Sequence, residues 1–247
     1  MIRTGIGGWV YPDWRGGTFY PQGLPQRREL EFASRALGAI EINGTFHSLQ
    51  KPDSFRKWRE HVPEDFVFAV KGSRFITNRK DLAAAEAAFG KFWDQGLAEL
   101  GECLGPILWQ LAATKRFVAE EIEAFLALLP RRLGKLDLRH AIEAGHESFR
   151  CPEFAALARK AGAAVAYVDD GKAMPMAERT ADFAYLRCKQ MRADCPTGYP
   201  PPELERIAGL CRTWSEQGDV YAFMINGAKE RAPAAAIALA QKLKGNA

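Results

Sequence analysis

The sequence predicts an α/β fold, a single (β/α)8 TIM-type barrel with a closed parallel sheet that forms one domain over residues 1–247. Three observations predict it. Eight short apolar segments alternate with about seven segments of helical periodicity, without a linker or a change of composition. The apolar segments are nearly continuous, as in parallel strands that are covered on both faces. The length of 247 residues suits one such barrel, and an open doubly wound sheet is the alternative.

Strands are expected wherever β-branched and aromatic residues gather in short runs. The expected strands are 2–7, 40–43, 66–71, 104–111, 141–146, 163–168, 183–187 and 220–225. All eight are expected to be parallel in one closed ring, with no antiparallel pair inside 2–225. The two termini should then lie close together on the N-terminal face of the barrel.

The first strand leads into an aromatic loop. Gly5-Ile6-Gly7-Gly8 is not a dinucleotide fingerprint, because Val10 stands at the third glycine position and Pro12 precedes any helix. The loop carries Trp9, Tyr11, Trp14 and Arg15. Its side chains can stack on a sugar or base, or they can form a hydrophobic lid. Because the loops after strands one and two leave the barrel at the same end, we expect Trp9, Trp14 and Phe46 to line the barrel mouth.

In the second strand, Glu41 and Asn43 share one face, and Gly44 ends the strand. A buried carboxylate needs a cationic partner. Lys71 ends the neighbouring third strand, so the sequence predicts a direct Glu41–Lys71 ion pair, or one ligand shared by the two groups, at the floor of the mouth.

Helices are expected from proline and capping signals followed by apolar residues at helical spacing. The expected starts are Pro25, Asp53 or Ser54, Asp81, the segment at Val118, Pro152, Pro202 and Pro233. The crossover after the sixth strand should be reduced, because residues 171–180 hold Met174, Met176 and a proline without helical periodicity.

The composition excludes several classes of protein. No apolar stretch is long enough to span a membrane, and the N-terminus runs into a strand without the apolar region of a signal peptide. Five cysteines, an odd number without a Cys-x-x-Cys pair, favour reduced thiols and a cytoplasmic location. The net charge of +4 permits an anionic substrate but is too small to imply nucleic acid.

Several motifs resemble the YecE-like family, known as domain of unknown function seventy-two. The matching segments are Gly8-Trp9-x-Tyr11-Pro12-Asp13-Trp14-Arg15-Gly16, Phe19-Tyr20-Pro21, Leu24-Pro25-Gln26-Arg27, Glu41-Ile42-Asn43-x-Thr45-Phe46, Phe68-Ala69-Val70-Lys71, Leu104-Gly105-Pro106, Gln110-Leu111, Glu143-x-x-His146 and Ala181-Asp182-Phe183. The resemblance covers nearly the whole chain and implies a (β/α)8 fold, without implying an activity.

The chain also departs from that family pattern at strand ends. Gly145 stands where an arginine is expected, and Lys189 stands where a histidine is expected. The turn after the eighth strand is Ile225-Asn226-Gly227 instead of an acidic, Asn-rich turn. His47 and Asn78 replace an expected tyrosine and histidine.

Polar residues recur near the C-terminal ends of the predicted strands, and these ends meet in one mouth. They are Glu41, Asn43, Lys71, Gln110, Glu143, Asp169, Arg187 and Asn226. As an active site, Glu41, Lys71, Glu143 and His146 would be catalytic, with a carboxylate as general base, and the other mouth residues would bind substrate with the aromatic loop. As a structural alternative, the same charges form a buried ionic layer that fixes strand register.

A metal site is less favoured. His47 and His146 are too few for a zinc cluster, whereas Glu41, Glu143 and Asp169 have the oxygen ligands for a single Mg²⁺ or Mn²⁺. Pairing of the carboxylates with Lys71 and Arg187 requires no metal or other cofactor and is preferred.

Three hypotheses for function follow from these residues. The first is a hydrolase or lyase that acts on an anionic or phosphorylated small molecule. The second is a nucleic-acid-binding barrel, for which weak affinity is expected because Glu41, Glu143, Asp169 and Asp170 near the mouth repel a polyanion. The third is a barrel whose site has decayed and which keeps a non-catalytic binding role.

Overall fold

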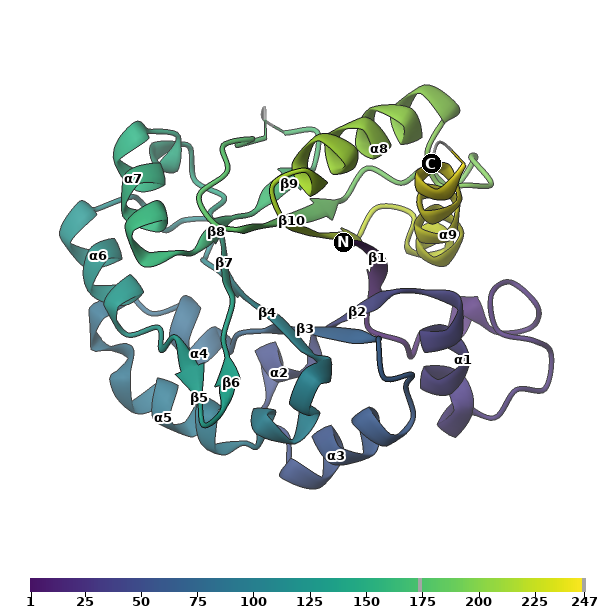
Figure 1. Ribbon diagram of the computed structural model, residues 1–247, viewed down its shortest axis with the longest axis horizontal. Helices are drawn as coiled ribbons and strands as arrows, with labels where there is room; N and C mark the ends of the chain where they lie inside the picture. Colours follow the sequence, from purple (N-terminus) through teal and green to yellow (C-terminus); the bar gives the residue numbers. More distant parts are fainter. Residues whose placement is uncertain (173–174, 246–247) are drawn as a thin grey trace.

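A computed structural model describes residues 1–172 and 175–245. Its centre is a sheet of parallel strands arranged as a barrel (Figure 1). The strands are β1 (Ile2–Gly7), β2 (Ala39–Ile42), β3 (Val67–Lys71), β4 (Leu104–Gln110), β7 (His140–Glu143), β8 (Ala164–Val165), β9 (Tyr167–Asp169), β10 (Phe183–Cys188) and β11 (Asp219–Met224). They correspond to the eight predicted strands, because β8 and β9 are two segments of the sixth one.

The sixth strand closes the ring. β8 pairs with β7 on one side, and β9 pairs with β10 on the other, so the sheet order runs β8-β7-β4-β3-β2-β1-β11-β10-β9. Only Ala166 separates the two segments, and its backbone N–H donates to Ile142 O at 2.9 Å. The predicted α/β barrel is therefore confirmed, with one interruption in its ring.

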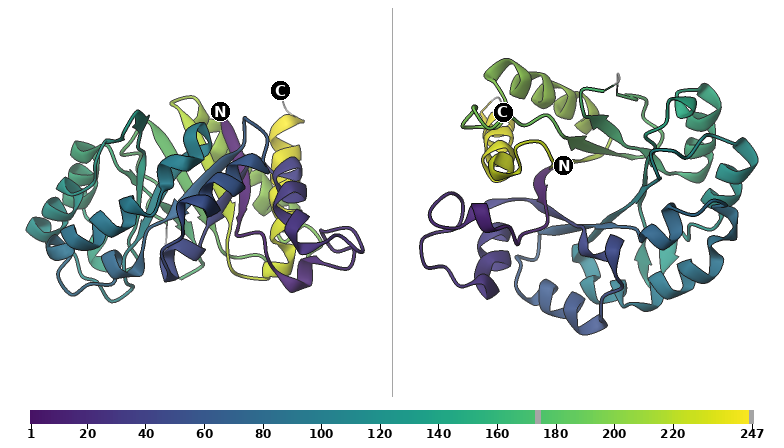
Figure 2. Two further views of the ribbon diagram at one scale, coloured as in Figure 1. Left: turned by 90° about the horizontal axis from the view of Figure 1, so that it is seen from below. Right: turned by 180° about the vertical axis from the view of Figure 1, so that it is seen from behind.

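Helices cover the outside of the sheet (Figures 1 and 2). They are α1 (Glu29–Ala36), α2 (Gly44–His47), α3 (Pro52–Glu60), α4 (Arg74–Thr77), α5 (Glu86–Asp94), α6 (Ala119–Ala127), α7 (Pro152–Ala161), α8 (Pro201–Ser215) and α9 (Ala232–Lys244). Short 3-10 turns occupy Pro12–Trp14, Gln26–Arg28, Ala83–Ala85, Leu97–Cys103, Glu147–Phe149 and Lys229–Arg231. None of the described helices combines the length and the apolar character that crossing a membrane requires.

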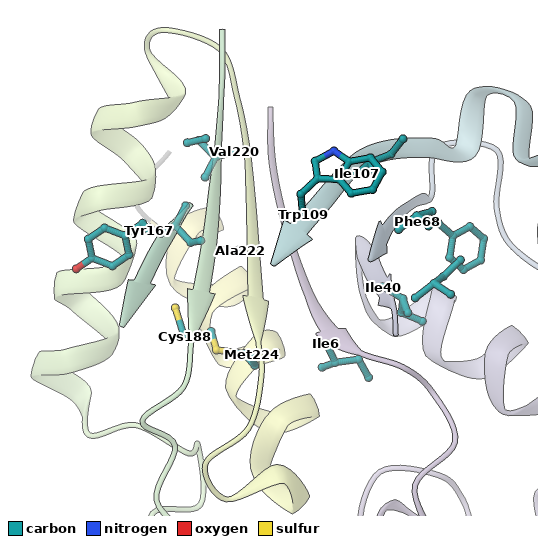
Figure 3. Close-up of a cluster of buried hydrophobic side chains, with 14 of the residues drawn as sticks. Ile6, Ile40, Phe68, Ile107, Trp109, Tyr167, Cys188, Val220, Ala222 and Met224 are labelled. Atoms are coloured by element: carbon teal, nitrogen blue, oxygen red, sulfur yellow. The ribbon is translucent and has the colours of Figure 1, made fainter. Parts of the chain in front are cut away.

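Alternation along the strands sorts the core into two layers. Outward-facing residues such as Ile40, Phe68 and Trp109 pack against the helices (Figure 3). Inward-facing residues fill the barrel, and they include Ala39, Ala69, Leu108, Phe183 and Phe223. Glu41 lies between Ile40 and Ile42, so it points inward as its position predicts.

The expectation that no antiparallel pair occurs inside 2–225 is wrong. Directly before β7, β5 (Arg132–Leu133) and β6 (Leu136–Asp137) form an antiparallel hairpin. Its turn is the dipeptide Gly134-Lys135, and Gly134 has a φ of 60°, which suits a two-residue hairpin turn. The hairpin lies outside the barrel sheet and leaves the parallel ring intact.

Two predicted helix starts also differ. α3 begins at Pro52, and its N-cap is Lys51 instead of Asp53 or Ser54, because proline is favoured in a first helical turn. Asp81 does accept a hydrogen bond from Ala83 N at 2.9 Å, but the backbone leaves the helical conformation at Ala84. The continuous helix α5 therefore starts only at Glu86.

The crossover after β9 contains no helix in its described residues, 170–172 and 175–182, as predicted, although Met174 lies outside them. The chain ends agree with the prediction as far as they are described. The Met1 ammonium pairs with Asp219 at 3.0 Å, and Lys244 lines the same surface pocket as Ile2. Figure 2 shows the end of α9 and the start of β1 at one end of the barrel.

Gly5 allows β1 and β2 to approach closely. It pairs with Ala39, and a Cβ at this position would lie 2.1 Å from Ala39 O, which is backbone. A side chain at position 5 would force these two strands apart.

Candidate functional site at the barrel mouth

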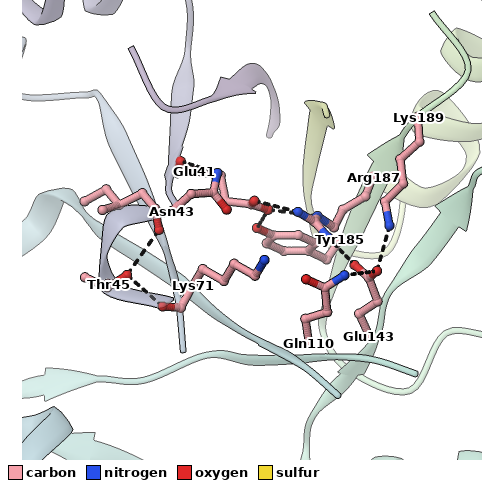
Figure 4. A network of polar contacts seen from close by, with 10 residues as sticks. Glu41, Asn43, Thr45, Lys71, Gln110, Glu143, Tyr185, Arg187 and Lys189 are labelled. Carbon is pink, nitrogen blue, oxygen red and sulfur yellow. Dashed lines mark hydrogen bonds and ion pairs between the residues drawn. The ribbon is translucent and has the colours of Figure 1, made fainter. Parts of the chain in front are cut away.

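Glu41 lies at the floor of the mouth, where side chains from across the ring bind it (Figure 4). Its carboxylate is fully buried. Tyr185 Oη donates to Glu41 Oε2 at 2.7 Å. Arg187 donates from Nε to Oε2 at 3.1 Å and from Nη2 to Oε1 at 2.9 Å. Tyr185 and Arg187 are two residues apart on β10, so both point into the barrel, and Arg187 is the cationic partner that Glu41 requires.

Arg187 also connects Glu41 to Glu143 on β7. Its Nη1 donates to Glu143 Oε2, while Lys189 Nζ and Gln110 Nε2 each donate to Glu143 Oε1 at 2.7 Å. We call these residues, with Glu41 and Tyr185, the ionic network. Burial tends to raise the pKa of Glu143, but Arg187 and Lys189 outweigh it and hold the pKa at about 2. Burial tends to lower the pKa of Arg187, but Glu41 and Glu143 raise it above its ordinary value, so Arg187 remains charged.

Acid should therefore weaken the fold through Glu143. Its pKa is about 2 in the folded chain against an ordinary value of 4.5, so the folded state favours the carboxylate. The resulting stabilisation, roughly 3 kcal/mol, is present above about pH 5.5 and is lost as the pH falls from there towards 2. Urea unfolding between pH 7 and pH 2.5 measures it. Glu143→Gln should flatten this acid-dependent loss, and an unchanged slope in that variant would contradict the assignment.

The predicted ion pair between Glu41 and Lys71 is wrong. Glu41 is in register with Ala69, so Lys71 lies two residues closer to the mouth, about 6–7 Å higher. Its Nζ lies 4.0 Å from the centre of the Phe46 ring, and no described carboxylate is within ion-pair distance. Burial lowers the pKa of Lys71 to about 8, and Arg187 adds to this while Glu41 and Glu143 oppose it.

A cavity of about 400 Å³ opens above the ionic network. Its lining comes from the C-terminal ends of the strands and the loops that follow them, and comprises Gly7, Gly8, Val10, Trp14, Asn43, His47, Lys71, Gln110, Arg187, Met224, Ile225, Asn226, Lys229 and Ala232. Lys229 Nζ lies 4.5 Å from the centre of the Tyr11 ring and 5.9 Å from that of Trp14. Burial lowers the pKa of Lys229 as well.

The lining thus brings together Trp14, Asn43, Lys71, Gln110, Arg187 and Asn226 from the predicted set. Asn226 has a φ of 63°, which is uncommon for a residue other than glycine. Trp14 is 1% exposed and donates from Nε1 to Lys229 O at 2.9 Å, so it fixes the loop that carries Lys229.

The rest of the aromatic loop has structural contacts. Trp9 packs edge-on against Trp58 of α3 at 5.2 Å and does not line the cavity, contrary to the expectation for the mouth. Arg15 pairs with the buried Glu29 at 2.6 Å. Tyr11 lies against Trp14 and under the Lys229 amine. Phe46 reaches the mouth through its contact with Lys71.

His146 and Asp169 lie away from the cavity. The His146 ring accepts a hydrogen bond from Ser148 N at 3.1 Å and contacts Ser148 Oγ, so it caps the turn Glu147–Phe149. Asp169 faces α8, where Arg206 binds it, and Gln190 from the loop after β10 also donates to it. Both faces of the sixth strand are apolar, so its sequence did not reveal which residues point inward.

The three carboxylates of the less favoured Mg²⁺ or Mn²⁺ site do not assemble. Arg187 bridges Glu41 and Glu143, while Asp169 lies on the outer face of the sheet. Across residues 1–172 and 175–245, no group of three or more His, Cys, Asp or Glu side chains is placed to hold a metal ion.

Sequence reasoning missed Tyr185 and Lys229, and it noted Lys189 only as a departure from a family pattern. Tyr185, Arg187 and Lys189 follow one another at intervals of two, and this alternation carried a usable signal for one inward-facing row. Lys229 lies in a loop, and its contact with Tyr11 joins residues 218 positions apart, which no local pattern reveals.

Comparison with known proteins gives one family. The sequence model described as "Protein of unknown function DUF72" matches residues 3–247. YecE of Escherichia coli K12 is 27% identical over 150 residues, which are 60% of this chain and 50% of YecE. YunF of Bacillus subtilis is 28% identical over 80 residues, 32% of this chain and 27% of YunF. The chain thus matches about half the length of YecE, or less in the case of YunF.

Solved structures agree with the fold. A DUF72 family protein from Thermotoga maritima has a TM-score of 0.81 at 22% identity, with 99% of each chain covered. One from Enterococcus faecalis has a TM-score of 0.77 at 16% identity, covering 99% of this chain and 96% of that one. A xylose isomerase domain containing protein from Salmonella typhimurium has a TM-score of 0.54 at 10% identity, covering 98% and 96%. These likenesses show the barrel fold alone.

Proposed function

The chain belongs to the DUF72 family of proteins of unknown function, and on that premise we propose that its barrel mouth binds a small anionic molecule and acts on it as a lyase or hydrolase. One observation carries the proposal. Two lysine amines, Lys71 and Lys229, line the same cavity, and neither has a carboxylate partner among the described residues. The cavity therefore presents positive charge with which no described carboxylate forms an ion pair.

The negative charges nearby are already bound. Glu41 and Glu143 each receive at least three hydrogen bonds or ion-pair contacts, all from the ionic network. Arg187 lines the cavity, and three of its five N–H donors bind these carboxylates. The side chains of Asn43 and Asn226 add amide donors at the rim. These groups suit a carboxylate or phosphate.

The structural alternative accounts for only part of the mouth. A buried ionic layer that fixes register would consist of Glu41, Arg187 and Glu143 and would need nothing more. It does not account for Lys71, whose partly buried amine has a lowered pKa and so opposes folding at neutral pH. A group kept in that state is useful as a base or nucleophile, since a pKa near the working pH favours proton transfer.

In this proposal, Lys71 takes the catalytic role and Lys229 binds the anionic part of the ligand. Glu41 and Glu143 act through Arg187 as positioning residues, because a carboxyl group with a pKa of about 2, such as Glu143, is a weak base at neutral pH. His146 and Asp169 have no role in this proposal, because His146 caps the turn at Ser148 and Asp169 binds Arg206 on the outer face of the sheet.

Nucleic acid is a less well supported ligand. Stacking on bases requires exposed aromatic faces, but Trp14 is buried and Trp9 packs against Trp58. A cavity of about 400 Å³ also suits a small molecule better than a strand. Non-specific contacts between a protein and nucleic-acid phosphates weaken steeply as the salt concentration rises. An oligonucleotide that still binds tightly at physiological salt would therefore favour the nucleic-acid alternative.

Inorganic phosphate is a direct probe of the anion site. Lys71→Met and Lys229→Met should each weaken phosphate binding by roughly ten- to a hundredfold, the effect expected for one charge-assisted contact, in isothermal titration. Lys160→Met is the matched control, because Lys160 is exposed and pairs with Glu123 on the outer helices. The melting temperature of Lys71→Met should not fall, since no described carboxylate loses a partner. Equal phosphate affinity in all four proteins would refute the anion site.

A further inference from the structure

The Lys71 amine is surrounded by charged groups without being bound by any of them. It ends β3 and points across the mouth towards Tyr185 and Arg187 (Figure 4). The charges that influence it come from the strands around the ring: Glu41 on β2, Glu143 on β7, Arg187 on β10 and Lys189 just beyond β10. Its own contact is with the face of Phe46 at 4.0 Å. Once the amine is deprotonated, its nitrogen has a lone pair to which no described side chain donates a hydrogen bond.

We propose that Lys71 forms an imine with the carbonyl group of a small anionic aldehyde or 2-oxo acid bound in this cavity. The inference rests on the proposed anion site for the orientation of its ligand, and it adds the class of substrate and the bond that is formed. Lysine amines become nucleophiles when they are desolvated or placed beside another cation. Lys71 is half-buried at the end of β3, its Nζ lies over the Phe46 ring, and Arg187 lines the same cavity.

The state of the amine agrees with this role. A lysine that only binds anions works as a solvated, permanently charged ammonium. Burial and the neighbouring Arg187 lower the pKa of Lys71 to about 8. At neutral pH the fraction of free amine is then roughly three-hundredfold larger than for an ordinary lysine. Lys229, on its separate loop, can hold the carboxylate or phosphate of the same ligand.

The reaction balances without an added oxidant or reductant. The Lys71 nitrogen attacks the carbonyl carbon, and the carbonyl oxygen takes up a proton as the C–N bond forms. The C–O bond of this carbinolamine then breaks, water leaves with that oxygen, and the nitrogen becomes a protonated imine. The overall change is amine plus carbonyl plus one proton to protonated imine plus water.

Such an imine withdraws electrons from the adjacent carbon and so assists cleavage or deprotonation there. Hydrolysis of an ester or phosphate has no need of it. The inference therefore favours the lyase over the hydrolase within the proposed function.

Trapping with a reductant tests the inference. The full chain is incubated at neutral pH with pyruvate and sodium cyanoborohydride, which reduces imines to stable amines, and the adducts are located by peptide mass spectrometry. Lys71 should carry at least about tenfold more adduct than exposed lysines such as Lys57 and Lys160, which serve as internal references. Lys71→Arg keeps the positive charge and should abolish this adduct while the others persist.

Pyruvamide, the uncharged analogue of pyruvate, separates the two proposals. Labelling of Lys71 by pyruvamide as well as by pyruvate, in a protein that does not bind inorganic phosphate, would support the imine and refute the anion site. Phosphate binding with labelling of Lys71 no higher than that of the exposed lysines, for both compounds, would overturn the imine and leave the anion site standing. Preference for pyruvate over pyruvamide at Lys71 is the result expected if both proposals hold.

Discussion

Replacement of Arg187 with methionine should lower the free energy of unfolding by roughly 3–5 kcal/mol, the cost of stranding a buried charge. The side chain of Arg187 is 3% exposed and is bonded to both Glu41 and Glu143. Methionine fills similar space but leaves two buried carboxylates with weaker compensation. Urea unfolding at pH 7 measures the loss, and far-UV circular dichroism shows whether the variant still folds.

Arg192→Met is the matched control for this change. Arg192 also pairs with a carboxylate, Asp194, but both side chains are more than half exposed, so the expected loss is at most about 1 kcal/mol. Adding Glu41→Gln and Glu143→Gln to Arg187→Met should recover part of the stability, because the stranded charges are then removed. Equal losses for Arg187→Met and Arg192→Met would contradict the buried network.

Gly5→Ala should lower the free energy of unfolding by roughly 3 kcal/mol or more, at the upper end of what overpacking costs. The added Cβ would lie 2.1 Å from the backbone oxygen of Ala39, and backbone inside a sheet cannot rotate away as a side chain can. The strands β1 and β2 would have to separate next to the strand that carries Glu41. Denaturant unfolding measures the effect, and loss of soluble protein would be its extreme form.

Gly90→Ala is the matched control, because the same substitution at this position should raise the free energy of unfolding instead of lowering it. Gly90 lies in α5 on the surface, and an added Cβ there would meet no atom within 4 Å apart from its chain neighbours and the backbone of its own helix. Alanine in a helix interior should raise stability by about 0.5–1 kcal/mol. Gly5→Ala with stability equal to that of the unmodified chain would show that the close approach of β1 and β2 is not a constraint.

Much of the architecture was predictable because it follows from local pattern. The strand segments are short apolar runs, and alternation alone places Glu41 inside the barrel. The interruption at Ala166 and the hairpin at Gly134 were not predicted, since each depends on hydrogen bonding that apolar periodicity does not encode.

The site was predicted in its location but not in its pairing. Because β2 and β3 are neighbours, the sequence suggested that Glu41 would pair with Lys71. The strand register instead places Glu41 beside Ala69, two residues below Lys71, and the cation that binds Glu41 is Arg187 of β10, across the ring. Depth within a barrel depends on the stagger of every strand, which a single sequence does not give. The position of Lys229 depends on a loop packing against Trp14 and Tyr11, and such contacts are tertiary.

The filled interior of the barrel determines how molecules can travel through it. Below Glu41 the barrel interior is filled by Tyr185, Phe223 and Phe183. The ionic network lies above them and spans the barrel. A ligand that reaches Lys71 must therefore arrive and depart by the same opening, past Lys229 and Asn226. If the proposed condensation at Lys71 takes place, the water that it releases has to leave through this same opening. Substrate and product would then share one entrance, whereas a barrel open at both ends would offer two.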